Sequence, residues 1–186
     1  MAHSRSYISI LANGAANGSM HHMENAARMD RPKYHRKFLA VLDGTDECAV
    51  AVTFAGCRMR RTGGIVKLLV VIEPDQFQHW IGVENVMRAE AFEEANRWLD
   101  DAEARIKALG DIPVEREIRE GPKADELEAA IAEDKDIAIL VLASSKSTDG
   151  PGPLVSSIAA RGANALPIPV AIVPGFLTDE QIEELS

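Results

Sequence analysis

Short continuous runs of apolar residues alternate along the chain with longer segments in which apolar residues recur every three or four positions. The continuous runs are typical of strands that a parallel sheet buries on both faces. The wider spacing is typical of amphipathic helices that pack on such a sheet. The apolar runs predict buried strands over residues 38–42, 65–72, 137–143 and 168–173.

Residues 112–118 alternate between apolar and charged side chains, which predicts a half-exposed strand at or near a sheet edge. Helical periodicity fills the intervals between the strands. It predicts helices over residues 46–61, 84–109, 123–132 and 153–165, and a short terminal helix from Thr178 with a capping-box spacing to Gln181. Strands and helices that alternate in this way form a doubly wound parallel sheet. The predicted fold class is therefore α/β, with one five-stranded, Rossmann-like sheet.

The first predicted helix carries signals at both of its ends. Thr45 is placed to cap its amino end, and Asp46 and Glu47 in the first turn suit the helix dipole. Gly63 and Gly64 are placed to end the helix.

The only two cysteines, Cys48 and Cys57, both lie on this helix. Their separation puts them on opposite sides of the helix, so they are predicted to be unpaired, buried apolar thiols. Neither belongs to a CxxC motif or a Cys/His cluster, so the sequence predicts no metal site.

The composition divides the chain into three parts. Residues 1–32 are rich in Asn, Gly, Ser, Ala and His without a persistent apolar period, which predicts a disordered tail. Residues 33–175 form the predicted α/β domain, and residues 176–186 form the C-terminal helix.

Charge and hydropathy exclude two classes of partner. The tail is basic, but the chain as a whole carries a net charge of -9, and an acidic domain repels nucleic acid. No apolar run has the length of about 20 residues that a membrane helix needs, and the N-terminus lacks the pattern of a secretory signal. We expect a cytoplasmic protein that binds neither nucleic acid nor a membrane.

Ligands of a doubly wound sheet bind beyond the carboxyl ends of its strands, where the winding reverses. Three segments are predicted to reach that edge. They are Asp43-Gly44-Thr45 after the first strand, Val71-Ile72-Glu73 at the end of the second, and the loop over residues 143–157 after the fourth.

The order of these segments resembles the universal stress protein family. The resemblance rests on Asp43 at the end of the first strand, on Ser156-Ser157-Ile158, and on Pro167-Ile168-Pro169-Val170 at the entry to the last strand. It covers about residues 34–173. It implies a domain related to the adenine nucleotide alpha hydrolases, in which Asp43 and Gly44 and the backbone at Val71 approach the adenosine part of a nucleotide.

Members of this family that bind ATP share a Gly-x2-Gly-x9-Gly-Ser/Thr pattern after the fourth strand. Aligned from Ser157, the three glycines fall on Ala143, Lys146 and Ser156, so only the final hydroxyl residue is kept. Gly150 and Gly152 offer a shifted turn for a phosphate, but the prolines beside them remove two N–H donors. The phosphate loop is therefore predicted to be degenerate.

Each of these positions can also be interpreted as having a structural role that involves no nucleotide. Asp43 suits the cap of the first helix as well as it suits a nucleotide contact. Ser156 and Ser157 suit hydrogen bonding at the start of a helix as well as phosphate binding. The sequence leaves both readings open.

No catalytic set is predicted. The chain has no Gly-Lys-Ser/Thr phosphate loop, Gly-x-Ser-x-Gly elbow or HExxH motif. His79, beside Trp80 in a loop, is read as a surface or interface residue. A nucleotide-dependent ligase of a related fold is disfavoured because the first strand lacks a pyrophosphate loop rich in Ser and Gly.

The last strand is apolar and requires a cover. In the family that the chain resembles, this strand lies at a sheet edge and pairs with its twofold mate. We therefore expect a homodimer, unless the terminal helix folds over the edge. The expected contact residues are Pro169, Val170, Ala171, Ile172 and Val173.

The function predicted from the sequence is that of a dimeric, non-enzymatic regulatory domain with weakened nucleotide binding. The alternative is a regulator that still binds ATP or AMP.

Overall fold

The computed structural model describes residues 36–73, 84–147, 150–161 and 166–186. The tail predicted over residues 1–32 and the loop that contains His79 and Trp80 lie outside these ranges.

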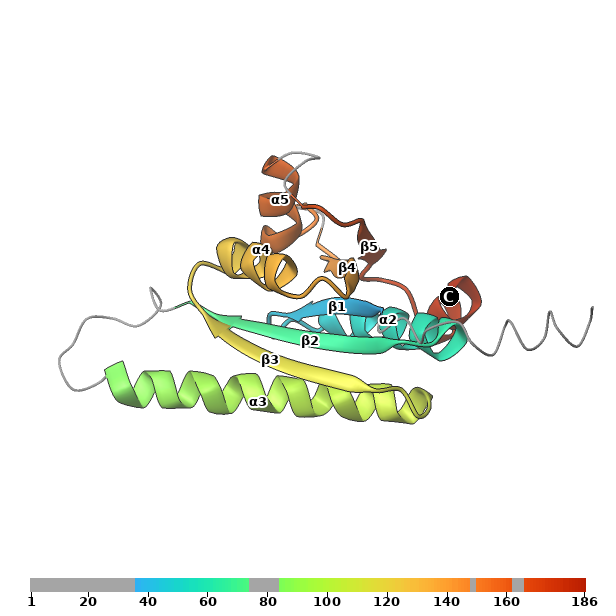
Figure 1. Cartoon of the computed structure of the whole chain (residues 1–186), viewed down its shortest axis with the longest axis horizontal. Helices are drawn as coiled ribbons and strands as arrows, with labels where there is room; N and C mark the ends of the chain where they lie inside the picture. The colour runs from blue at the N-terminus through green and yellow to red at the C-terminus, as the bar shows by residue number, and fades with distance from the viewer. Residues whose placement is uncertain (1–35, 74–83, 148–149, 162–165) are drawn as a thin grey trace, which may run out of the picture. The chain divides into compact units, whose positions relative to one another are not determined.

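The described residues form the predicted parallel sheet with helices on both faces (Figure 1). The strands are β1 (Lys37–Leu42), β2 (Ile65–Ile72), β3 (Val114–Glu120), β4 (Ile137–Ser144) and β5 (Val170–Pro174). The helices are α2 (Cys48–Thr62), α3 (Glu84–Leu109), α4 (Lys123–Glu133), α5 (Pro153–Ala160) and α6 (Asp179–Leu185).

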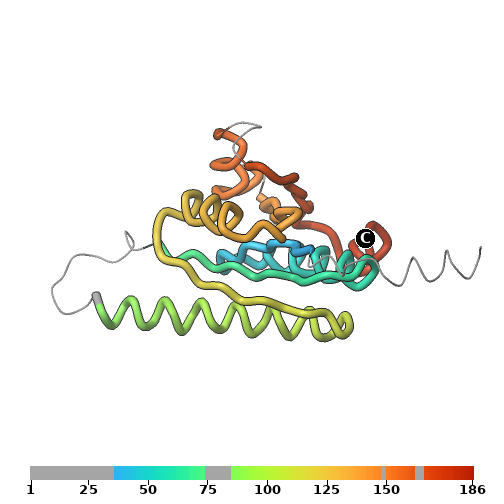
Figure 2. The backbone as a smooth tube through the Cα atoms, in the orientation of Figure 1, coloured from blue at the N-terminus to red at the C-terminus, as the bar shows by residue number. Residues whose placement is uncertain are grey.

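The sheet order is β3-β2-β1-β4-β5, and all neighbouring strands are parallel. The first three strands extend the sheet in one direction, and the chain then returns through α4 to add β4 on the other side of β1. Figure 2 shows the result, with β3 and β5 on opposite sides of the central β1. The winding therefore reverses between β1 and β4, which is where such folds bind ligands.

Alternation along β1 divides the core into two layers. Phe38, Ala40 and Leu42 face α2 and α3, whereas Leu39 and Val41 face α4 and α5. All five side chains are buried. Because successive side chains in a strand point to opposite faces, a central strand covered on both sides must be apolar throughout.

Two strands begin two residues later than predicted. The N–H of Val66 donates to Pro113 O and the N–H of Leu140 donates to Pro169 O, so both prolines act as acceptors at the ladder ends. Proline has no N–H to donate, and each strand starts at the following residue. The prediction was also too long for α5, which ends at Ala160.

The terminal helix α6 packs against α2 and not along the outer edge of β5. Its Ile182 is fully buried, and Arg58 on α2 donates a hydrogen bond of 2.9 Å to the carbonyl oxygen of Ser186. The predicted capping box is present, with the Gln181 N–H bonded to Thr178 Oγ1 at 3.3 Å and the Thr178 N–H to Gln181 Oε1 at 3.0 Å. The edge strand β5 keeps Val170 and Ile172 exposed, at 36% and 51%.

One charged cluster interrupts the apolar layer beneath α4. Lys67 on β2 is only 8% exposed, and its ammonium lies 2.9 Å from both Glu117 Oε2 and Asp134 Oδ2. Lys37 on β1 reaches the same Asp134 oxygen at 2.9 Å and Glu115 Oε2 at 2.7 Å. Asp134, directly after α4, thus neutralises two lysines that the sheet would otherwise hold in poor contact with water.

Candidate functional site

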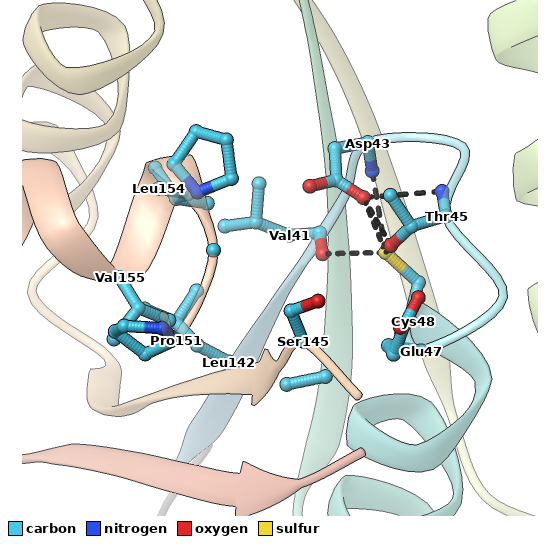
Figure 3. Close-up of a pocket in the computed structure, with 13 residues that line it drawn as sticks. Val41, Asp43, Thr45, Glu47, Cys48, Leu142, Ser145, Pro151, Leu154 and Val155 are labelled. Carbon is cyan, nitrogen blue, oxygen red and sulfur yellow. Dashed lines mark hydrogen bonds between the residues drawn. The ribbon is translucent and has the colours of Figure 1, made fainter. Parts of the chain in front are cut away.

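The carboxyl ends of β1 and β4 enclose a small cavity of about 80 Å³ at the switch point of the sheet (Figure 3). The turn after β1 forms one wall, and the loop between β4 and α5 forms the other. The walls are lined by Val41, Asp43, Thr45, Glu47, Cys48, Leu142, Ala143, Ser145 and residues 151–155.

One carboxylate oxygen of Asp43 faces this cavity, and the other, Oδ1, is held by the turn after β1. Its Oδ1 accepts hydrogen bonds from the Thr45 hydroxyl at 2.7 Å, the Thr45 N–H at 3.2 Å and the Cys48 thiol at 2.9 Å. Figure 3 shows these contacts on one side of the carboxylate, with the other oxygen turned toward the α5 side of the cavity. Burial alone would raise the pKa of Asp43, but the bonds from Cys48 and Thr45 outweigh burial and lower it. The residue is an anion at neutral pH.

Cys48 differs from the apolar buried thiol that was predicted. It is only half-buried, lines the cavity and donates to Asp43, while its sulfur accepts the Asp43 N–H at 3.3 Å. Burial, the hydrogen bond to Asp43 and the negative charge of Asp43 raise the pKa of Cys48 to about 11. The thiol therefore stays protonated at neutral pH and acts as a hydrogen-bond donor. Cys57 is fully buried, as predicted, and both cysteines are free.

The predicted capping role of Thr45 was wrong. The residue at the N-cap position of α2 is Glu47, and its side chain makes no capping hydrogen bond. Thr45 lies before the helix, and its hydroxyl is used by Asp43. The Asp-x-Thr spacing allows this local turn, which competes with capping for the same side chains.

The loop after β4 uses its backbone donors internally. The N–H of Ser145 donates to Pro151 O at 3.0 Å, and the N–H of Ser147 donates to Ser145 Oγ at 3.0 Å. The N–H of Lys146 donates to Glu47 Oε1 at 3.1 Å. Pro151 and Pro153 have no N–H, so most of the loop's described backbone donors are unavailable to a phosphate.

The cavity brings together only some of the predicted site residues. Asp43, Ala143 and Gly152 line it. Gly44 instead lines a neighbouring hollow of about 500 Å³ between α2 and α3, beside Trp98.

The remaining predicted site residues lie outside the cavity lining. Val71 is buried beneath α4, and Gly150 is exposed. Ser156 and Ser157 lie in the second turn of α5, where the Ser156 N–H bonds to Gly152 O. This backbone bond is the ordinary one within a helix, so the structural and nucleotide readings of both serines stay predictions.

Sequence reasoning did not identify Glu47 as a cavity residue, it included Ser145 only within the loop over residues 143–157, and it assigned Cys48 to the core. All three lie within six residues of a predicted strand end. That proximity is the signal that was available. The hydrogen bond from the Lys146 N–H to Glu47 joins two segments far apart in the sequence, so no local sequence pattern predicts it.

Comparison with known proteins identifies the family. A model of the universal stress protein family matches residues 35–174. The chain therefore belongs to the universal stress protein family, as its resemblance predicted. A comparison with curated proteins returned no match.

Solved structures share the fold at low sequence identity. Universal stress protein UspA from Lactobacillus plantarum is 19% identical, with a TM-score of 0.60 over 77% of this chain and 99% of that chain. A universal stress protein from Archaeoglobus fulgidus in complex with dAMP is 16% identical, with a TM-score of 0.55 over 76% and 99%. A universal stress protein in complex with cAMP is 21% identical, with a TM-score of 0.57 over 74% and 96%.

The described residues contain no group of three or more His, Cys, Asp or Glu side chains arranged to hold a metal ion. No helix in the described ranges combines the length and apolar character needed to cross a membrane.

Proposed function

We propose that this chain is a dimeric, non-enzymatic regulatory domain of the universal stress protein family whose site has lost the ability to hold a nucleoside triphosphate. The observation that carries the proposal is the internal use of three consecutive backbone donors directly after β4. The N–H groups at Ser145, Lys146 and Ser147 have partners inside the protein, and two prolines follow them. A triphosphate needs several unpaired N–H donors in such a loop.

The size of the cavity supports the same conclusion. Small-molecule sites usually measure about 300–1,000 Å³, and the cavity between β1 and β4 measures about 80 Å³. The space admits a few water molecules or one small group of a ligand.

The state of Cys48 supports the absence of covalent catalysis by a thiol. This thiol is the strongest nucleophile that lines the cavity, and nucleophilic catalysis requires its thiolate. With a pKa of about 11 and a carboxylate as its neighbour, Cys48 is held in its unreactive form.

One alternative has specific support. The free oxygen of Asp43 faces the cavity, and two structurally similar proteins contain dAMP or cAMP. A nucleotide in this chain would use Asp43, the backbone at Val71, Gly150, Gly152 and Ser157. This alternative treats the chain as an ATP- or AMP-binding regulator.

The dimer is proposed through β5. The strand lies at the sheet edge, exposes Val170 and Ile172, and is not covered by α6, which packs on α2. An exposed apolar edge strand pairs readily with a second copy of itself. Pro169, Ala171 and Val173 complete the proposed contact.

Native mass spectrometry tests assembly and ligand state together. We expect a species of twice the 20.2 kDa chain mass that carries no added nucleotide. Ile172→Lys should raise the dimer dissociation constant at least tenfold, because it brings a positive charge from each copy into the proposed apolar contact. Val86→Lys, at an exposed apolar position of α3, serves as the matched control and should stay dimeric. A monomer at micromolar concentration, or a stoichiometric bound nucleotide, would contradict the proposal.

A further inference from the structure

The side chain of Glu47 crosses from the start of α2 to the loop after β4. Its Oε1 accepts the Lys146 N–H at 3.1 Å, across 99 positions of sequence. Glu47 lines the cavity together with Asp43 and Ser145. The contact therefore joins the two walls of the candidate site.

A helix-capping role does not account for this position. Glu47 occupies the N-cap position of α2, but its side chain makes no capping hydrogen bond. The carboxylate instead accepts the Lys146 N–H of the loop after β4.

Packing on a glycine fixes the orientation further. A Cβ at Gly175, directly after β5, would lie 2.7 Å from Glu47 Cγ and would overlap the carbonyl oxygen of Ser144. Only glycine lets the chain after β5 pass this close to the Glu47 stem. The hydrogen bond from the Lys146 N–H is the main cause that lowers the pKa of Glu47, so its charge is kept at neutral pH.

Lys146 stands where the ATP-binding pattern of the family has its second glycine. The backbone N–H at that position belongs to the loop that would meet a phosphate, and here it is bonded to a carboxylate. A carboxylate and a phosphate oxygen are both anionic acceptors for a backbone N–H.

We propose that the Glu47 carboxylate is a built-in anion that takes the place of a ligand phosphate and makes the site discriminate against nucleoside polyphosphates. The inference rests on the proposed loss of triphosphate binding and names the residue that enforces it. Glu47 acts in two ways. It occupies the Lys146 N–H, and its negative charge, which is exposed to solvent at this contact, repels a polyphosphate. An uncharged nucleoside has no phosphate, so neither effect should change its binding.

The test compares ATP with adenosine on purified full-length variants. Glu47→Gln removes the charge and keeps an oxygen that accepts the Lys146 N–H, so the loop fold is preserved. Glu47→Ala also frees the N–H. Glu93→Gln, at an exposed residue of α3, matches the change in net charge and serves as the control. Dissociation constants are measured by calorimetry, and circular dichroism verifies the folding of each variant.

We expect the dissociation constant for ATP to fall at least tenfold in Glu47→Gln and further in Glu47→Ala. The dissociation constant for adenosine should be the same in these variants as in the wild type. The Glu93→Gln control should bind ATP as the wild type does. Equal ATP binding by the wild type and both Glu47 variants would overturn the role of Glu47. An equal gain for ATP and adenosine would also overturn it, because charge would then not be the cause. If the wild type itself binds ATP at micromolar concentration, the proposed loss of triphosphate binding fails, and the ratio between variants still decides the role of Glu47.

Discussion

Replacing Gly44 with alanine is expected to lower the free energy of unfolding by about 3 kcal/mol. Gly44 follows Asp43 and has φ +78°, a backbone conformation that costs an L-residue about 1–2 kcal/mol. An added Cβ would also overlap the indole ring of Trp98 on α3, with two further ring atoms at 2.8 Å. Overpacking of this kind typically costs about 1–3 kcal/mol. Urea unfolding of the purified variant measures the sum.

Gly63→Ala is the matched control for this prediction. Gly63 ends α2 with φ +73°, and a Cβ there meets nothing within 4 Å. It therefore carries only the positive-φ backbone cost, about 1–2 kcal/mol as at Gly44, and no steric cost. The difference between the two variants isolates the contact with Trp98. Equal losses in both variants would show that Trp98 does not support the turn that presents Asp43.

The second large effect is expected at Asp134. Asp134→Asn leaves Lys67 with Glu117 and Lys37 with Glu115 as their remaining carboxylates. Breaking a buried ion pair costs about 3–5 kcal/mol, and because each lysine keeps one partner we expect about 2–3 kcal/mol at pH 7. Asp136→Asn, at an exposed residue of the same turn, is the control and should cost little.

The effect of Asp134→Asn should depend on pH in a defined direction. Burial alone would raise the pKa of Asp134, but hydrogen bonds from Lys67 and Lys37 outweigh burial and lower it to about 2. An aspartate with a pKa below the value of about 3.9 in the unfolded chain stabilises the fold above that value. This contribution is lost as the pH falls toward 2. The stability difference between wild type and variant should therefore shrink between about pH 5 and pH 2, and a difference independent of pH would contradict the assignment.

The order of elements was predictable because its signals are local and strong. The apolar run over residues 65–72 and the alternation near residues 114–118 each define a strand without reference to the rest of the chain. The capping box at Thr178 and the glycine stop at Gly63 are local for the same reason. The strands predicted to start at Ile112 and Ile168 begin two residues later, because the apolar pattern continues through Pro113 and Pro169, which cannot complete the ladder.

The site was less predictable because its decisive contacts are not local. Asp43 was found from its place at a strand end, but the donors that occupy its Oδ1 depend on how the turn after β1 folds. Thr45 was assigned to the helix because a cap and an Asp-x-Thr turn require the same residue types. The bond between Lys146 and Glu47 joins loops that only the sheet topology brings together.

The proposed loss of triphosphate binding is tested most directly by titrating the wild-type chain with ATP in a calorimeter. The internal use of the loop donors and the Glu47 charge predict a dissociation constant no tighter than the millimolar range, about −4 kcal/mol of binding free energy. A micromolar dissociation constant with a stoichiometry near one site per chain would contradict the account and favour the nucleotide-binding alternative.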